Sequence, residues 1–242
     1  AHEAWLAKAE ERWGVPAEIV VGVIGIESLY GQHMGNYRVL DALATLSFDF
    51  PSGRSDRSAF FRSELGDFLL LCHHRATDPT QPRGSYAGAM GLGQFMPSSV
   101  ARFALDFDED GAVDLTGNAA DAIGSVAHYL AGFGWQRGVP PRFEVVAPAQ
   151  AQDLAVLLAP DITPTFTAQE LTERGAQLAP QAMTFDGKLA LVELHNGDGA
   201  PSFVAGTDNF YAITRYNWSS YYALAVVELG EAVARERRRS VL

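Results

Sequence analysis

The chain has 242 residues, of which 48% are hydrophobic and 19% charged, and it carries a net charge of −11. This composition is typical of a folded globular protein with one or two domains and excludes a disordered chain. The acidic balance argues against a general nucleic-acid binder, which needs a basic surface. No apolar run approaches the length of about 18 residues that a membrane-spanning helix requires.

Residues 1–136 show mainly helical periodicity, with apolar side chains recurring every three or four positions. Gly14 and Pro16 are typical of a helix end followed by a helix start, and Ser55 and Asn118 are candidate N-caps. The expected helices are Ala1–Trp13, Ala17–Tyr30, Asp41–Phe50, one after Ser55 that includes Phe61–Cys72, one opening at Pro97, and Ala122–Leu130.

The chain changes character after Trp135. Residues 137–185 hold six of the twelve prolines and β-like runs such as Phe143–Val146, so we expect a small insertion with short strands. Residues 186–242 are again regular. The elements expected after residue 136 are short helices at Asp153–Leu158 and Gln169–Leu178, a strand at Leu189–Leu194, an aromatic-rich stretch at Asn209–Tyr216 and a final helix that includes Tyr222–Val233.

Glu27 is the first candidate catalytic residue. Val20, Val23 and Ile24 precede it by seven, four and three residues, so all four side chains share one face of a helix. A carboxylate in apolar surroundings has its charged form disfavoured, which predicts a raised pKa and suits a general acid. A Glu that pairs with a basic residue at the rim of the core would give the same pattern.

A glycine-rich loop follows at residues 85–99. Four glycines stand within ten residues, one directly before Ser85 and three after it; this density is unfavourable in a regular element and allows backbone to approach a ligand closely. Ser85 and Gln94 bracket the last three glycines, with Tyr86 and Phe95 beside them, and such polar and aromatic groups suit a sugar ligand. A tight connection between two packed helices explains the loop equally well.

An acidic run at residues 106–114 matches the first nine positions of an EF-hand loop. Oxygen ligands at these spacings suit Ca²⁺, with the backbone carbonyl of Ala112 at position 7. Position 12 is Gly117 in place of the usual Glu, and Asp121 is the residue that could close a longer loop. The predicted metal ligands are Asp106, Asp108, Asp110, Ala112 and Asp121; the alternatives are a helix cap at Asp121 and a solvated acidic turn.

Other catalytic and metal-binding patterns are missing from the sequence. It contains no Gly-x-Ser-x-Gly elbow, no phosphate-binding loop and no zinc-type spacing among its six His and single Cys. Cys72 lies in an apolar run, so a buried structural thiol is expected there in place of a nucleophile. As the only cysteine, it cannot form an intrachain disulfide.

Taken together, several motifs resemble the membrane-bound lytic transglycosylase B family. The resemblance covers nearly the whole chain, and its specificity comes from the ordered set, since each motif alone is weak. The motifs are Ile26-Glu27-Ser28-x-Tyr30-Gly31, the run Gly88–Ser99 with Gln94, the run Asp121–Ser125, and the run Asn209–Asn217.

The resemblance implies a mainly α protein with a lysozyme-like helical core and a small inserted β subdomain. Residues 1–136 would form the catalytic core with an N-terminal helical part, 137–185 the insertion, and 186–242 the segment that completes the core. It also implies cleavage of peptidoglycan between N-acetylmuramic acid and N-acetylglucosamine. Glu27 would act first as acid and then as base, leaving a 1,6-anhydromuramic end without consuming water.

The resemblance also implies further site residues. They are Ser85, Gln94, Tyr129, Tyr216, Asn217 and Tyr222 for the substrate. We expect Tyr216 to orient Glu27 through a hydrogen bond. Trp218 stands where the family more usually has a polar or basic residue, which predicts a changed edge of the substrate site.

No cofactor is expected for the chemistry, although the acidic run is a candidate structural Ca²⁺ site. The expected partners are peptidoglycan strands and other cell-wall enzymes, not nucleic acid, and the protein is expected to be a periplasmic monomer, with an outer-membrane anchor if one exists outside this chain. Two alternatives stay open: a hydrolytic muramidase with a second carboxylate, and a non-catalytic peptidoglycan-binding protein.

Overall fold

The computed structural model describes residues 2–240, which divide into two compact units. The first unit contains the chain up to Arg12 and Pro16–Tyr129; the second contains Trp13–Val15 and the chain from Leu130 onward. Helices account for most of the regular structure, so the prediction of a mainly α protein is confirmed. Among the described residues, none of the helices has both the length and the apolar character needed to cross a bilayer.

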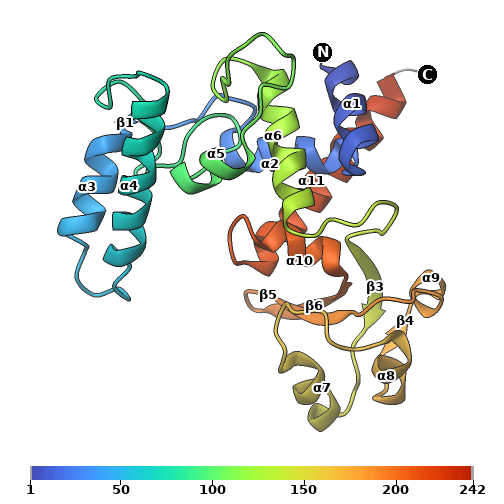
Figure 1. Cartoon of the computed structure of the whole chain (residues 1–242). Coiled ribbons are helices and arrows are strands. Elements are labelled where there is room, and N and C mark those ends of the chain that lie inside the picture. The colour runs from blue at the N-terminus through green and yellow to red at the C-terminus, as the bar shows by residue number, and fades with distance from the viewer. Residues whose placement is uncertain (1, 241–242) are drawn as a thin grey trace. The chain divides into compact units, whose positions relative to one another are not determined.

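Helices and one short strand pair build the first unit (Figure 1). α3 and α4 lie side by side as a hairpin, because both present an apolar face. Val39 and Leu43 of α3 pack with Phe61, Phe68 and Cys72 of α4. Cys72 is buried as expected, and this burial raises the pKa of its thiol. The elements are α1 (Glu3–Trp13), α2 (Ala17–Ser28), β1 (Tyr37–Arg38), α3 (Val39–Phe48), α4 (Ser58–His74), β2 (Arg83–Gly84), α5 (Pro97–Phe103) and α6 (Ala119–Gly132), whose last three residues belong to the second unit.

A four-stranded antiparallel sheet with strand order β4-β3-β6-β5 forms part of the second unit (Figure 1). The apolar side chains of Leu189, Leu191 and Ala205 pack with Leu157 of α7 and Leu171 of α8, which gives this part its own core. The elements are β3 (Arg142–Val146), α7 (Ala151–Leu158), α8 (Ala168–Glu173), β4 (Gln177–Leu178), α9 (Pro180–Met183), β5 (Ala190–Asn196), β6 (Gly199–Gly206), α10 (Asp208–Thr214) and α11 (Ser220–Ser240).

The sheet joins segments on both sides of residue 185, the expected end of the insertion. β3 pairs with β4 and with β6, and β6 pairs with β5. β6 was not expected, because Gly199, Pro201 and Gly206 mask the strand pattern. Gln177–Leu178 was expected to continue a helix but forms β4, since Gly175 at a φ of 86° ends α8.

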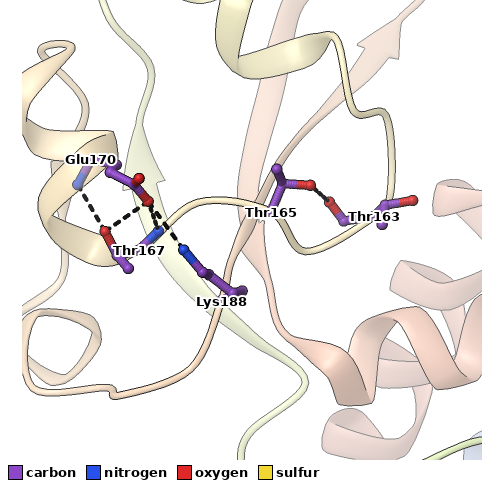
Figure 2. A network of polar contacts seen from close by, with 5 residues as sticks. All are labelled: Thr163, Thr165, Thr167, Glu170 and Lys188. Carbon is purple, nitrogen blue, oxygen red and sulfur yellow. Dashed lines mark hydrogen bonds and ion pairs between the residues drawn. The ribbon is translucent and has the colours of Figure 1, made fainter.

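Hydrogen-bonding side chains fix the start of α8 (Figure 2). Thr167 Oγ1 accepts a bond of 3.1 Å from the Glu170 backbone N–H, while Glu170 Oε2 accepts one of 2.7 Å from the Thr167 N–H. Such a capping box satisfies two donors that a helix N-terminus otherwise leaves open. Lys188 adds an ion pair to Glu170 at 3.3 Å, so the segment before β5 is tied to the start of α8.

Candidate active site

Glu27 lies at the last turn of α2, one residue before the helix ends at Ser28. Val20, Val23 and Ile24 are buried as the helical spacing predicts, whereas the side chain of Glu27 is half-buried. A carboxylate at the edge of an apolar face can reach a ligand and still be shielded in part from water. Those are the surroundings that general acid chemistry needs.

Ser28 links the end of α2 to the glycine-rich loop. Its side chain is only 1% exposed, and Oγ lies 2.8 Å from the carbonyl oxygen of Leu92, to which it donates. The same Oγ accepts a 3.1 Å bond from the Gly31 N–H. The residue next to Glu27 therefore fixes the helix end against the loop that contains Gln94. Its positioning role was not predicted, because a buried serine in a helix has no distinctive sequence signal.

The chain leaves α2 through three consecutive residues in the left-handed region. Leu29, Tyr30 and Gly31 have φ values of 48°, 56° and 89°. This conformation is unfavourable for the first two, which suggests that the sharp exit is needed to place the end of the helix. A Cβ at Gly31 would come within 2.9 Å of Leu92 Cδ2, a flexible side-chain end that can move aside, so the positive φ is the main reason for glycine here.

Ser85 and Gln94 both stabilise the glycine-rich loop itself. Ser85 Oγ accepts a bond of 3.1 Å from the Ala89 N–H, and Gln94 Nε2 donates to the Gly91 carbonyl at 2.7 Å and to the Met34 carbonyl at 3.3 Å. Gly91 has a φ of 74°, and a Cβ there would lie 2.5 Å from the Leu115 carbonyl oxygen. The loop is therefore a packed, hydrogen-bonded unit in which both side chains remain partly exposed.

A buried carboxylate holds the helix that follows this loop. Glu64 of α4 is 4% exposed, and its two oxygens accept bonds from the Ser98 backbone N–H at 2.9 Å and from Ser98 Oγ at 2.7 Å. Ser98 is the second residue of α5, where backbone N–H groups lack partners within the helix. Glu64 thus caps α5 from a neighbouring helix and has both oxygens committed to that cap.

Tyr129 belongs to an aromatic cluster. Its side chain is 6% exposed, with its ring centroid 5.6 Å from that of Phe95 and 5.0 Å from that of Phe103. Phe95 follows Gln94 directly, so the ring of Tyr129 packs against the glycine-rich loop through Phe95. Most of this expected substrate residue is therefore packed in the core of the first unit.

The acidic run forms a compact loop. Ligand oxygens of Asp106, Asp108 and Asp110 all lie within 4.8 Å of one another, a spacing that a single cation can bridge. Asp108 Oδ1 is buried and, among the described residues, has no hydrogen-bond donor. A buried carboxylate oxygen without a donor is costly. The donor set and this oxygen therefore fit a hard cation.

Asp121 stabilises the backbone of this loop. It is fully buried, Oδ1 accepts a bond of 2.7 Å from the Phe107 N–H, and Oδ2 accepts one of 2.8 Å from the Asp114 N–H. Asn118 caps α6 as expected, accepting a 2.9 Å bond from the Ala120 N–H. The structure thus gathers Asp106, Asp108 and Asp110, while Asp121 bonds the backbone within that run at Phe107 and after it at Asp114.

In the second unit, Tyr216, Asn217 and Tyr222 lie where α10 turns into α11. The rings of Tyr216 and Tyr222 are stacked, with centroids 6.2 Å apart and an interplanar angle of 23°. Tyr222 is 8% exposed, whereas Asn217 is exposed. The motif therefore places two tyrosine rings together and leaves the amide beside them open to solvent.

Comparison with protein families finds one match across most of the chain. A family model described as "Transglycosylase SLT domain" matches residues 1–231. The chain is 44% identical over 238 residues to the membrane-bound lytic murein transglycosylase B of Escherichia coli strain K12. That match covers 98% of this chain and 62% of the relative, so the chain spans less than two thirds of the relative's length.

Solved structures with the same fold include two bacterial enzymes. The soluble lytic transglycosylase SltB1 of Pseudomonas aeruginosa has a TM-score of 0.86 and 42% identity, covering 98% of this chain and 76% of its own. The Escherichia coli lytic transglycosylase Slt35 in complex with calcium has a TM-score of 0.85 and 40% identity, covering 98% and 72%. The expectation of a lysozyme-like fold is confirmed by these similarities.

Proposed function

Because the chain belongs to the transglycosylase SLT domain family, we propose that it is a lytic transglycosylase of bacterial peptidoglycan. The bond cleaved is the β-1,4 linkage between N-acetylmuramic acid and N-acetylglucosamine. One observation carries this proposal for the chain's own residues: half-buried Glu27 stands at the end of α2, and Ser28 ties it to the loop that contains Gln94. The lytic murein transglycosylase activity of the relatives supports the substrate.

A single carboxylate accounts for both steps of the reaction. Protonated Glu27 gives its proton to the glycosidic oxygen, the C1–O bond breaks, and the N-acetylglucosamine leaves as an alcohol. The Glu27 carboxylate then takes the proton from the C6 hydroxyl of the muramic acid, and that oxygen bonds to C1. The product is a 1,6-anhydro ring, Glu27 is protonated again, and no water enters. Because the group donates a proton and then accepts one, its pKa must suit both roles.

The remaining site residues divide into two groups. In the first unit, Ser85 and Gln94 offer partly exposed polar groups on a rigid loop, and Tyr129 supports that loop. In the second unit, Asn217 offers an exposed amide beside the stacked rings of Tyr216 and Tyr222. We assign all six to substrate binding. We also propose that the inserted β-containing part comprises β5 and β6 in addition to residues 137–185, because β3 pairs with β6 and β6 pairs with β5.

Calcium is the cation we assign to the acidic loop. Asp106, Asp108 and Asp110 would supply side-chain oxygens to the ion, and Ala112 its backbone carbonyl. Asp121 would be the last residue of the site, in place of the Glu at position 12 of an EF-hand loop. The calcium complex of Slt35 supports this choice. The ion would hold the loop in shape and is not needed for the chemistry of Glu27. We further place the protein in the periplasm, where its peptidoglycan substrate lies.

The test compares digestion of purified sacculi by the wild-type chain and by a Glu27→Gln variant. Glutamine keeps the shape of the side chain but cannot give or take the proton. We expect the wild type to release fragments with anhydromuramic ends. The variant should be at least about a thousandfold slower, in the upper part of the range for lost acid–base catalysis, because both proton transfers depend on Glu27. Unchanged release by a folded variant would rule out Glu27 as the catalyst.

A further inference from the structure

An exposed tryptophan stands in the turn between α10 and α11. Trp218 is 60% exposed, follows Asn217 directly and lies two residues before the start of α11. A single exposed apolar residue on a protein surface needs no explanation by itself. Trp218 differs from that case because two other side chains contact its ring.

Two side chains hold the indole. Tyr211 of α10 meets it edge to face, with ring centroids 6.0 Å apart and planes at 81°. The guanidinium of Arg215 lies 5.1 Å from the Trp218 ring centroid, 5.8 Å from that of Tyr211 and 5.4 Å from that of Phe133. Edge-to-face pairs and cation–π contacts each stabilise an aromatic ring in one orientation. The indole therefore has a fixed orientation, while the residue as a whole stays 60% exposed to water.

The position of this ring in the sequence connects it to the substrate residues of the second unit. Asn217 is the preceding residue, and Tyr216 of the same turn stacks on Tyr222 of α11. Asn217 and Trp218 are both exposed, so an amide donor and acceptor and an aromatic ring follow one another on the surface of this turn. This pairing suits a pyranose ring, which has an apolar C–H face and a rim of hydroxyl and acetamido groups.

We propose that Trp218, oriented by Arg215 and Tyr211, is a stacking platform for one sugar ring of the glycan strand, with the Asn217 amide binding the rim of that ring. The inference rests on the proposed function, because it takes its ligand from the peptidoglycan substrate. The platform contributes affinity and not chemistry, since it carries no group that can transfer a proton to or from the reacting atoms.

The test measures binding by calorimetry in the Glu27→Gln background, so that turnover does not interfere. The probe is a peptide-free tetrasaccharide of alternating N-acetylglucosamine and N-acetylmuramic acid. We expect Trp218→Ala to raise Kd about 2- to 10-fold, as for loss of one aromatic contact, and Trp218→Phe to restore most of the affinity. This loss should be the same at low and high salt, because stacking on a neutral ring is not screened.

Phe48 provides a matched control. It is an exposed aromatic, at 72%, with the Arg62 guanidinium 5.5 Å from its ring centroid, but it lies at the end of α3 in the first unit. Phe48→Ala should leave the Kd for the tetrasaccharide unchanged. In active protein, Trp218→Ala should raise KM for soluble glycan and leave kcat close to that of the wild type.

Two results would overturn the platform. One is a Kd for Trp218→Ala equal to that of its background. The other is a loss seen only with probes that carry stem peptides, which would assign the ring to the peptide. Failure of the proposed function looks different: the wild type would yield no anhydro ends, while the effect of Trp218→Ala on tetrasaccharide binding in the Glu27→Gln protein would stand.

Discussion

At the residue scale, Ser28 anchors the end of α2 beside Glu27, the residue proposed as the catalyst. Ser28 bonds both the Leu92 carbonyl and the Gly31 N–H from a fully packed position. The first bond reaches the glycine-rich loop and the second closes the left-handed exit from α2. One hydroxyl therefore stabilises two segments that place Glu27 relative to Gln94.

We predict that Ser28→Ala destabilises the protein by about 1–3 kcal/mol and lowers kcat, because the partly buried Gly31 N–H and Leu92 carbonyl lose their partner. The free energy of unfolding, from urea denaturation, measures the first effect. Release of anhydro ends measures the second.

Ser47 is the matched control for this prediction. It is fully buried in α3, but its Oγ donates only to the Leu43 carbonyl one turn earlier in the same helix. Ser47→Ala should cost clearly less stability and leave kcat unchanged. Equal effects of the two substitutions would contradict a positioning role for Ser28.

Glu170 gives a residue-scale prediction about pH. Hydrogen bonds from the Thr167 N–H and hydroxyl, and then the contact with Lys188, hold the pKa of the Glu170 carboxyl below its ordinary value. A lowered folded-state pKa gives stability that is present above the unfolded pKa, near 4.5, and is lost as pH falls through the folded value. The difference in unfolding free energy between wild type and Glu170→Gln should therefore be constant near neutral pH and shrink below about pH 4.5.

A double-mutant cycle with Thr167→Ala checks the cause. If the capping box lowers the pKa, the pH-dependent part of the Glu170→Gln effect should be much smaller in the Thr167→Ala background. A pH-dependent effect of the same size in both backgrounds would show that the capping box is not its cause.

The sequence predicts candidate site residues well where the chemistry needs a particular residue type at a fixed spacing. Glu27 on an apolar helix face and the acidic run at residues 106–114 belong to this class. A surface or capping role was expected for Glu64, but the partners of Ser28 and Glu64 could not be predicted. Their partners, Leu92 and Ser98, lie 64 and 34 residues away, and no local pattern specifies such bonds.

At the element scale, the acidic loop contains three carboxylates that repel one another on a backbone that hydrogen bonds hold in place. Asp106, Asp108 and Asp110 are close enough to repel one another, while Asp121 holds the backbone beneath them. A bound cation would remove the repulsion and give the buried Asp108 Oδ1 a partner. The loop should therefore be more stable with Ca²⁺ than without it.

We predict that millimolar Ca²⁺ raises Tm of protein first treated with a chelator. At a Ca²⁺ concentration a hundredfold above Kd, binding stabilises the folded protein by about 2.7 kcal/mol. Asp108→Asn should abolish this rise. Because the substitution relieves repulsion, it should also make the calcium-free protein as stable as the wild type or more so. Differential scanning calorimetry measures both effects.

Glu109 is the control carboxylate in the same loop. Its side chain is 84% exposed, and it pairs with Lys8 at 3.8 Å. Glu109→Gln should keep the full calcium response. An absent response in the wild type, or a full response in Asp108→Asn, would contradict the assignment.

The observed ends of the helices agree with the predicted ones where a proline or glycine marks them. Pro97 opens α5, and Gly14 follows the end of α1. α4 differs from the expectation, because Asp56 and not Ser55 accepts the bond of 2.8 Å from the Ser58 N–H at its start. Asp and Ser are both good acceptors there, so composition alone does not choose between neighbours.

At the scale of the whole molecule, the sheet shows what local patterns omit. β3 pairs with β6 about 60 residues later in the chain, through partners such as Phe143 and Ala205. The helical core could be predicted from periodicity and from the family motifs, but this pairing depends on contacts between distant segments. The sheet therefore extends beyond residues 137–185, the expected insertion, to β5, where a strand was expected, and to β6, where none was.

We propose that one carboxylate, Glu27, cleaves the glycan without water. Digestion of sacculi in ¹⁸O-labelled water, followed by mass spectrometry, tests it most directly. We predict muramic ends with the anhydro mass and no ¹⁸O, and loss of these products in Glu27→Gln. Reducing muramic ends that carry ¹⁸O would show hydrolysis by an activated water and would contradict the account.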